Sequence, residues 1–201
     1  MKKVLVLAFL LCLYCGGGEQ TQAPTDTEMP QITKSVLMII APKDFRDEEF
    51  KEPYDLFTKS GIKVTIASTD MQPAQGMLGM TVKPDIILEQ VIPDSFDVLV
   101  VVGGTGCETL WDNTVLHKIV QHFNDEKKTI AAICIAPVVL AHAGILKDTK
   151  ATAYPAVKDE IGLCGATYTG TDVEVCGNII TCSGPTAAKD FAETILNTLS
   201  Q

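Results

Sequence analysis

Basic residues are few in this chain. Among its 201 residues, 16 Lys and Arg stand against 25 Asp and Glu, which gives a formal net charge of −9 and a pI near 4.7. Such a chain repels nucleic-acid phosphates and anionic membrane surfaces, so neither is expected as a general partner. Only 20% of the residues are charged and 46% are hydrophobic, which excludes a disordered or coiled-coil protein. Chemistry on a small molecule is the better expectation.

The N-terminus lacks an apolar run long enough to span a bilayer comfortably. Residues 4–15 are uncharged and largely apolar, but the run is short, and Lys2 and Lys3 precede it. This pattern predicts a secretory signal peptide over residues 1–15. The polar, glycine- and threonine-containing stretch 16–33 predicts a flexible tether.

Cys15 stands where a bacterial lipoprotein is cleaved and acylated. Tyr14 is large for the preceding position, and Cys12 replaces the usual leucine, so the lipobox match is weak. An ordinary cleaved signal and a retained short anchor are the alternatives. We expect an exported protein, which contacts a membrane only through a lipid anchor if Cys15 is acylated.

The remaining chain predicts one α/β domain over residues 34–201, a length that suits a single core. Short apolar runs without alternation are typical of buried parallel strands, and helical patterns lie between them. The expected strands are 35–41, 62–67, 96–102, 129–134 and two around Gly177 within 173–182. The expected helices are about 47–60, 112–125, 137–143, 155–163 and 185–199. In such a sheet the ligand site lies at the carboxyl ends of the strands.

Zinc-type cysteine spacing is missing from the domain. Its five cysteines are Cys107, Cys134, Cys164, Cys176 and Cys182. No C-x-x-C pair occurs among the last three, so we expect no metal, and nothing indicates a cofactor. The odd number leaves at least one thiol unpaired. A disulfide among the last three cysteines and simple packing of small apolar thiols both fit the sequence.

A glycine turn, Gly103-Gly104-Thr105-Gly106, follows the strand at 96–102. It lacks the third glycine of a dinucleotide fingerprint. Its backbone N–H groups could converge on an anion, or the turn could serve only as a tight strand-to-helix connection.

Cys134 lies where a buried strand stops and a helix begins, which is the geometry of a nucleophile elbow. Ala132 and Ala136 are the small residues that such a bend needs on either side, and Pro137 suits the first helical turn. The N–H groups of the helix start predict a lowered thiol pKa and a nucleophilic thiolate. A buried, inert cysteine is the alternative.

A thiolate at an elbow needs a proton partner, and the sequence offers few. His117, His122 and His142 are the only histidines, and none is adjacent to the elbow. The loop 41–53 carries several carboxylates after the first strand. One of them, turned toward the thiolate, would keep its proton and donate a hydrogen bond to sulfur, but chemistry alone does not select which one.

Five motifs together resemble the PfpI family: D-E-E-F-K-E-P, V-V-V-G-G-T-G, A-A-I-C-I-A-P, T-A-Y-P and C-S-G-P-T. The resemblance covers residues 35–199. The resemblance implies a flavodoxin-like three-layer sandwich with a mainly parallel sheet, and a homodimer. It implies a reactive Cys134 held by the glutamate four residues before Pro53, which is Glu49. It further implies an oxyanion site at the backbone of Gly103, Gly104 and Ile135, and Tyr154 as a pocket residue.

The resemblance also implies a function. Ile135 stands where the peptidase-like members have the histidine of a Cys-His pair, so peptidase activity is not the first expectation. We expect a cysteine-dependent enzyme, of glutathione-independent glyoxalase or deglycase type, acting on small reactive carbonyls in protection against carbonyl or oxidative stress. Cys134 would attack the carbonyl and Glu49 would move the proton. The alternatives are a redox sensor or chaperone using the same cysteine, and a peptidase- or amidase-like hydrolase.

Overall fold

A seven-stranded sheet forms the centre of the domain. The computed structural model describes residues 34–199, so the predicted signal peptide, the tether and Cys15 lie outside the described residues. The strand order is β11-β12-β8-β7-β1-β3-β6, and every neighbouring pair is parallel except β11 with β12. The strands are β1 (Ser35–Ile39), β3 (Lys63–Ser68), β6 (Ile86–Ile87), β7 (Val98–Val101), β8 (Thr129–Ile133), β11 (Val173–Cys176) and β12 (Ile179–Cys182).

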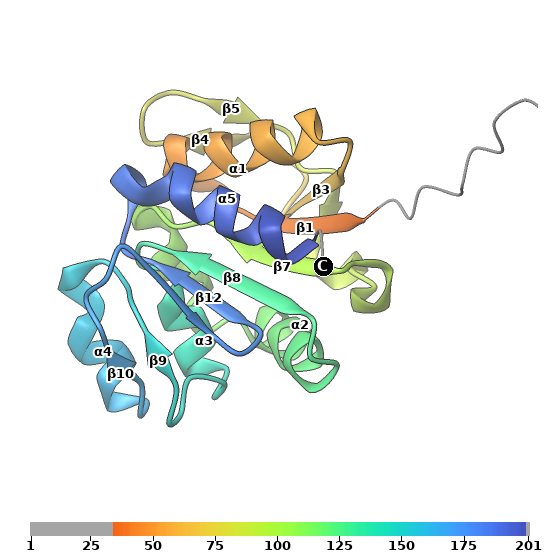
Figure 1. Ribbon diagram of the computed structural model, residues 1–201. Coiled ribbons are helices and arrows are strands. Elements are labelled where there is room, and N and C mark those ends of the chain that lie inside the picture. Colours follow the sequence, from red (N-terminus) through yellow and green to blue (C-terminus); the bar gives the residue numbers. More distant parts are fainter. Residues whose placement is uncertain (1–33, 200–201) are drawn as a thin grey trace, which may run out of the picture. The chain divides into compact units, whose positions relative to one another are not determined.

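Helices cover both faces of the sheet, which confirms the predicted three-layer α/β architecture (Figure 1). Helices α1 (Asp47–Lys59) and α5 (Ala188–Leu199) lie side by side on one face, and α2 (Thr114–Asp125) and α3 (Pro137–His142) cover the other. Helix α4 (Lys158–Leu163) packs beside α3. No helix among the described residues is long and apolar enough to cross a membrane.

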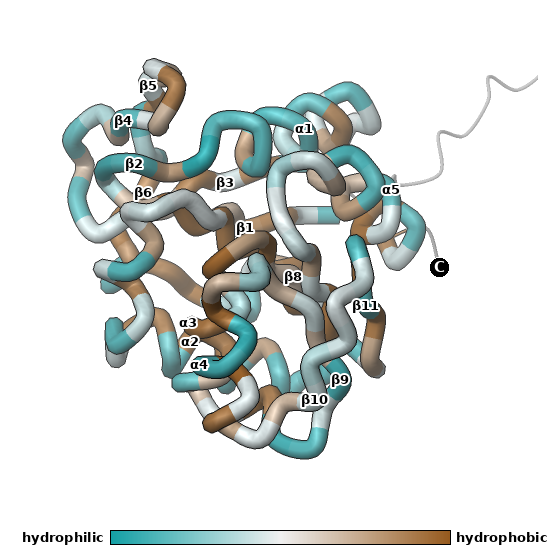
Figure 2. The backbone as a smooth tube through the Cα atoms, turned by 90° about the vertical axis from the view of Figure 1, so that its left-hand side faces the viewer, coloured by the Kyte–Doolittle hydropathy of each residue, from teal (hydrophilic) through white to brown (hydrophobic). Residues whose placement is uncertain are grey.

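The central strand β1 shows why its sequence is apolar without alternation. Leu37 and Ile39 point into the core under α2 and α3, whereas Val36 and Met38 point into the core under α1 and α5. Successive side chains of a strand face opposite sides, so a strand buried on both faces has no polar position. The tube in Figure 2 shows this as brown inner strands surrounded by paler and teal connections.

The helices begin where the sequence supplies a suitable first residue. The side chain of Asn113 accepts hydrogen bonds from the N–H groups of Val115 and Leu116, so α2 starts at Thr114, two residues later than expected. Pro137 opens α3, and the predicted helices at Pro155 and Pro185 begin as 3-10 turns.

The short elements were not predicted from the sequence. A small sheet of β2 (Lys43–Phe45), β4 (Ala74–Gly76) and β5 (Thr81–Val82) lies beside the main sheet, and β9 (Lys150–Ala151) pairs with β10 (Thr167–Tyr168). The 3-10 turns are η1 (Leu88–Gln90), η2 (Pro93–Ser95), η3 (Thr105–Leu110), η4 (Pro155–Val157) and η5 (Pro185–Ala187). Segments of two or three residues are too short to show a period.

Candidate active site

Cys134 forms the turn between β8 and α3 at the carboxyl end of the sheet. Its φ of +64° lies in the left-handed region, which costs free energy for a residue with a side chain. Two backbone hydrogen bonds hold the strained turn: the Cys134 N–H donates to the Cys182 carbonyl at 2.9 Å, and the Tyr154 N–H donates to the Cys134 carbonyl at 2.8 Å. The elbow is therefore tied to β12 and to the segment that carries Tyr154.

Two backbone N–H groups approach the sulfur of Cys134. They belong to Gly104 in the glycine turn and to Ile135, and both lower the pKa of the thiol. Gly104 has a φ of +97°, and a Cβ there would collide with the backbone of Arg46 and Asp44, so only glycine allows this close approach. The same N–H groups are positioned to bind an oxyanion formed at an atom attached to the sulfur.

Glu49 lies in the first turn of α1 and is fully buried beside Cys134. A Cβ on Gly103 would stand 2.5 Å from Oε2 of Glu49 and 2.7 Å from Cβ of Cys134, so the glycine turn, the acid and the cysteine are in close contact. Gly103 is thus placed against Glu49, and its N–H influences that carboxylate rather than the sulfur. It does not line the cavity described below.

The carboxylate of Glu49 has no fully formed hydrogen bond. Neither Oε1 nor Oε2 has a partner with hydrogen-bond geometry, although Cys134 and the Gly103 N–H lie near enough to lower its pKa. Burial outweighs these contacts and raises the pKa of Glu49 to about 7. A buried, poorly partnered carboxyl group at this position is ready to exchange a proton near neutral pH.

The pKa of the Cys134 thiol is raised, whereas its position at a helix start led us to expect a lowered value. Burial and the charge of Glu49 raise the pKa of Cys134 to about 12, which outweighs the two N–H groups that lower it. The expectation of a lowered thiol pKa is therefore wrong for the free protein, as is the idea that Glu49 stabilises the thiolate. Both groups resist ionisation together, so the pair carries one shared negative charge between their two pKa values.

The carboxylates of the loop after β1 have separate tasks. Asp47 is buried, and its oxygens accept hydrogen bonds at 2.8 Å from the N–H groups of Leu78 and Met80, which fixes the β4–β5 connection. Glu48 pairs with Arg46 through two contacts, from Nε at 2.8 Å and from Nη2 at 3.0 Å. Only Glu49 reaches the cysteine, which agrees with the residue implied by the family resemblance.

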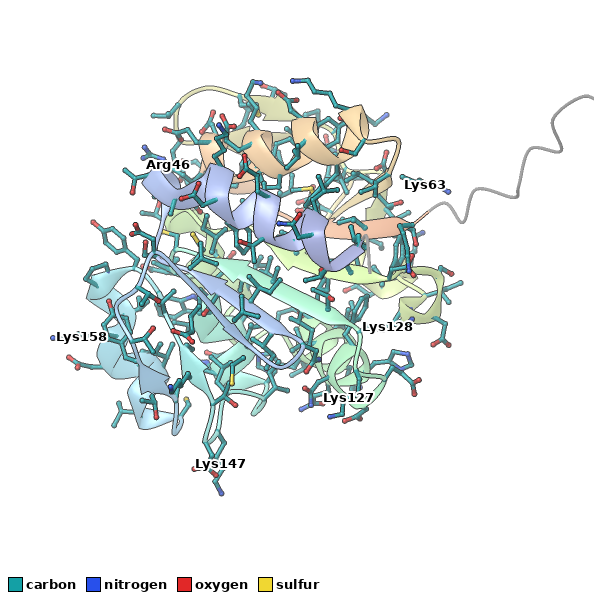
Figure 3. All side chains as sticks on the ribbon, viewed as in Figure 1. Arg46, Lys63, Lys127, Lys128, Lys147 and Lys158 are labelled. Carbon is teal, nitrogen blue, oxygen red and sulfur yellow. The ribbon has the colours of Figure 1, made fainter. Side chains whose placement is uncertain are left out.

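A cavity of about 470 Å³ opens at Cys134. Tyr154, Gly104 and Ile135 line it, and nearly half of the surface of Tyr154 is exposed. The other lining residues, none of which was predicted from the sequence as a site residue, are Arg46, Met77, Thr105, Glu108, Ala156, Val157 and Pro185. In Figure 3 Arg46 lies on the left, whereas Lys63, Lys127 and Lys128 lie on the right, which is the amino end of the parallel strands.

None of the three histidines lines this cavity. His117 contacts the carbonyl of Trp111 at 2.6 Å, and His122 pairs with Asp94 at 2.8 Å. His142 contacts Asp112 through Nδ1 and Glu160 through Nε2, each at 2.9 Å. A Cys-His pair is therefore not built from the histidines of this chain.

The other four cysteines of the described residues are also free thiols. Cys107 and Cys182 are buried and pack in the two cores, whereas Cys164 and Cys176 are partly exposed. Burial also raises the pKa of Cys107, and it raises that of Cys182 to about 12. Among the described residues, no group of three or more His, Cys, Asp or Glu side chains could hold a metal ion.

The domain that carries this site matches a known family. A model of the DJ-1/PfpI family matches residues 34–198. The chain belongs to the DJ-1/PfpI family. Its resemblance to a ThiJ/PfpI domain protein from Brachyspira murdochii extends to the fold, with a TM-score of 0.81 and 34% identity over 84% of this chain and 97% of that one.

Curated relatives from this family carry several names. A protein of Methanocaldococcus jannaschii described as uncharacterised is 44% identical over 83% of this chain and 82% of its own length. A deglycase of Pyrococcus abyssi is 33% identical over 74% and 90%, respectively. A glutathione-independent glyoxalase of Caenorhabditis elegans is 30% identical over 83% and 89%. Proteins named as a deglycase and as a glutathione-independent glyoxalase are therefore among the relatives.

Proposed function

We propose that this protein is a cysteine-dependent enzyme acting on small reactive carbonyls, of the glutathione-independent glyoxalase or deglycase type. The observation that carries the proposal is the buried, unpartnered carboxyl group of Glu49 beside Cys134, both of which line one cavity. The names of the two relatives above support the reaction class.

The first chemical step would be addition of the Cys134 sulfur to an aldehyde carbon. The sulfur–carbon bond forms, and the electron pair of the carbonyl bond moves to oxygen. The N–H groups of Gly104 and Ile135 stabilise the negative oxygen until it takes the proton that Cys134 and Glu49 share. The product of this step is a hemithioacetal, and Glu49 is left as a carboxylate.

The second step would use that carboxylate as a base. With a 2-oxoaldehyde, Glu49 removes the proton from the former aldehyde carbon, which gives an enediol, and returns it to the neighbouring carbon. The hydroxyl proton of the hemithioacetal moves to the former ketone oxygen, so that the sulfur-bearing carbon becomes the carbonyl of a thioester and its neighbour carries the hydroxyl. Water then hydrolyses the thioester and releases a 2-hydroxy acid and the Cys134 thiol. The net reaction adds one water to the dicarbonyl and needs no oxidant.

Conversion of methylglyoxal to lactate in the absence of glutathione tests the proposal. The wild-type protein should form lactate, and Cys134→Ser should form none. Cys176→Ser is a matched control, because Cys176 is a partly exposed thiol on β11 that does not line the cavity. Lactate formation at the same rate in Cys134→Ser, or none in the wild type, would contradict the proposal.

A redox function would use the same cysteine. Cys134 is the one thiol that lines the cavity, so an oxidant entering there would meet it before the buried Cys107 and Cys182. Limiting iodoacetamide followed by peptide mapping should label Cys134 ahead of both. Faster labelling of Cys107 would contradict the assignment of Cys134 as the reactive thiol under either function.

Export, acylation of Cys15 and a homodimer stay predictions from the sequence. They are tested by detergent partitioning of the wild type against Cys15→Ser, and by the mass of the purified domain in solution. An aqueous wild-type protein cleaved away from Cys15 would contradict the lipid anchor.

A further inference from the structure

The charges on the wall of the Cys134 cavity do not cancel. Arg46 is the one basic residue of the lining, and the carboxylate of Glu48 already pairs with it through two contacts. A bidentate pair of this kind neutralises the guanidinium as seen from the cavity. The lining contains no lysine. Glu49, buried beside Cys134 and without a hydrogen-bond partner, adds negative charge to the lining when it is ionised.

Glu108 adds a second negative charge that has no counter-ion. It is an exposed residue on η3, the 3-10 turn that follows Gly104, and its side chain is part of the cavity lining. Its carbonyl accepts a hydrogen bond from the Trp111 N–H, but its carboxylate forms no hydrogen bond or ion pair with any described residue. The lining of the cavity therefore contains an unpaired carboxylate as well as the reactive sulfur.

The rest of the lining also suits a cation. Tyr154 lines the cavity with 47% of its surface exposed, and an aromatic face attracts an ammonium or guanidinium group. Met77, Ile135, Val157 and Pro185 are apolar, so they accept the carbon skeleton of a substrate without competing for its charge. The net charge of −9 gives the whole molecule a field that favours approach of cations.

We propose that this cavity selects carbonyl compounds that carry a cationic group, an ammonium or a guanidinium, close to the reactive carbonyl, and that Glu108 is the residue that selects them. The inference rests on the proposed addition of Cys134 to a carbonyl. Glu108 would contact the cation while the sulfur forms its bond. A carbonyl compound with a carboxylate in the same place would be disfavoured, because Glu108 and the Cys134–Glu49 pair both repel it.

Two aldehydes of the same shape separate charge from size. Betaine aldehyde carries a trimethylammonium group, and 3,3-dimethylbutanal carries a tert-butyl group in its place. Each forms a reversible hemithioacetal, so each should protect Cys134 against iodoacetamide without any turnover. The quantity measured is the ratio of the concentrations of the two aldehydes that give half-protection, in the wild type and in Glu108→Gln. Differences in hydration between the aldehydes cancel when the ratio is compared between proteins.

We expect betaine aldehyde to lose its advantage in Glu108→Gln, by about 5- to 10-fold relative to the neutral aldehyde. Glu108→Lys should shift the ratio further in the same direction. Added salt should shrink the wild-type ratio, since the carboxylate is exposed. Glu89→Gln is the matched control, because Glu89 is an exposed acid on η1 outside the cavity and should leave the ratio unchanged.

The outcomes separate this inference from the proposed function. An equal ratio in the wild type, Glu108→Gln and Glu108→Lys would overturn the charge selection while leaving carbonyl chemistry at Cys134 intact. Failure of both aldehydes to protect Cys134 would overturn the proposed function and the inference with it. A solvated Glu108 that only supports the η3 turn would alter the melting temperature of the variants but not the ratio.

Discussion

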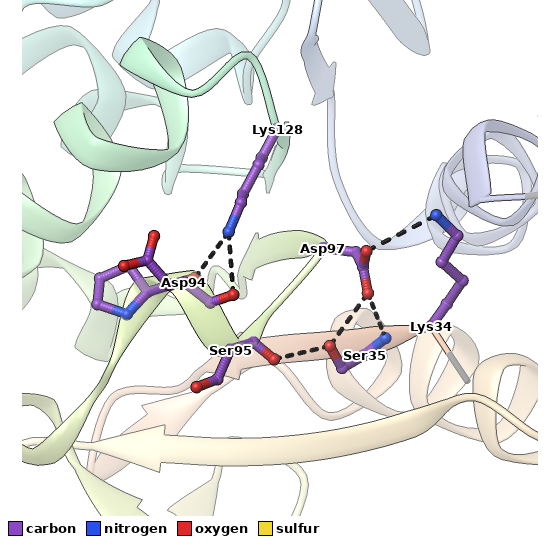
Figure 4. A network of polar contacts seen from close by, with 7 residues as sticks. Lys34, Ser35, Asp94, Ser95, Asp97 and Lys128 are labelled. Atoms are coloured by element: carbon purple, nitrogen blue, oxygen red, sulfur yellow. Dashed lines mark hydrogen bonds and ion pairs between the residues drawn. The ribbon is translucent and has the colours of Figure 1, made fainter. Parts of the chain in front are cut away.

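The two ends of the central sheet differ in how their polar groups are treated. At the amino end, Asp97 accepts hydrogen bonds from the N–H of Ser35 at 2.8 Å and from its hydroxyl at 3.1 Å, and Lys34 lies 3.7 Å away (Figure 4). Lys128 donates to two carbonyls of the neighbouring loop, those of Pro93 and Asp94. These polar groups are paired, and they hold β1 and β7 in register.

At the carboxyl end, several features that are unfavourable for stability occur together. Cys134 adopts a left-handed backbone, Gly104 takes a φ closed to other residues, and the buried Glu49 has no fully formed hydrogen bond. Each feature costs free energy, and each serves the chemistry of the sulfur. The difference teaches that the amino end was shaped by stability and the carboxyl end by the site. Substitutions at the two ends should therefore have opposite signatures.

Replacing Glu49 by Gln should give the largest effect. Turnover of methylglyoxal should fall by about 10²-fold or more, because an amide cannot carry the proton. Stability should rise. The pKa of Glu49 goes from 4.5 to about 7 on folding, so the folded state binds the proton more tightly and loses stability as pH rises through this interval.

The stability gained by Glu49→Gln should therefore depend on pH. It should be near zero at about pH 4 and reach up to roughly 3 kcal/mol above about pH 8, as an upper bound from the pKa change. Urea unfolding at the two pH values measures it. The thiol pKa should also fall, as seen in the ultraviolet absorbance of the thiolate, because Glu49 raises it. A variant with wild-type turnover, or one less stable at high pH, would contradict the role of Glu49.

Gly→Ala substitutions at the two ends of the sheet should differ in their effect on stability. An added Cβ at Gly103 would lie 2.5 Å from Oε2 of Glu49 and 2.6 Å from the Ile133 carbonyl oxygen. Gly103→Ala would therefore push the glycine turn away from β8, and it should lower the free energy of unfolding by about 3 kcal/mol. Gly61 lies in the turn before β3 with a φ of +75° and nothing within 4 Å of its Cβ, so Gly61→Ala should cost only about 1 kcal/mol. Thermal melting measures both, and equal losses would mean that the contact at Gly103 relaxes freely.

Removing an acid at the amino end should have the opposite sign from Glu49→Gln. Asp97→Ala leaves the Ser35 N–H and hydroxyl without their acceptor and should lower stability by about 1 kcal/mol, since Asp97 is partly exposed and water replaces part of the loss. Turnover of methylglyoxal should not change, because Asp97 lies at the other end of β7. A gain in stability on this substitution would remove the contrast between the two ends.

The framework of the fold could be predicted from the sequence because strands buried on both faces leave unbroken apolar runs. The sheet and its main helices follow from those runs, except for the edge strand β6 at Ile86–Ile87, which was not predicted. The elements at 43–45, 74–76 and 81–82 could not be predicted, because their pairing depends on which loops meet in space. The hydrogen bonds from Leu78 and Met80 to Asp47 connect positions more than thirty residues apart.

The site was predictable only in part, for the same reason. The elbow is local, so Cys134 could be found from Ala132, Ala136 and Pro137. The choice of Glu49 came from the family resemblance, since several nearby carboxylates had the same chemistry. Burial raises the pKa of Cys134, whereas the N–H groups at the helix start lower it. Burial depends on contacts from β12 and α1 that the local sequence does not show.

The smallest expected effect is at His142. Helix α3 begins beside the strained turn at Cys134 and ends at His142, whose two ring nitrogens both have polar partners. Burial lowers the pKa of His142, but the carboxylates of Glu160 and Asp112 raise it by more, so the net change is upward. Both ring nitrogens contact carboxylates, an arrangement that only the imidazolium satisfies with two N–H donors.

A raised pKa of His142 in the folded protein adds stability that is complete below the unfolded value near 6.5 and disappears as pH rises through the folded value. His142→Gln should therefore cost less than about 1 kcal/mol at about pH 5.5 and almost nothing at about pH 9. Urea unfolding of both proteins at the two pH values measures this, and a loss that grows with pH would show that His142 stabilises the helix end as the neutral ring.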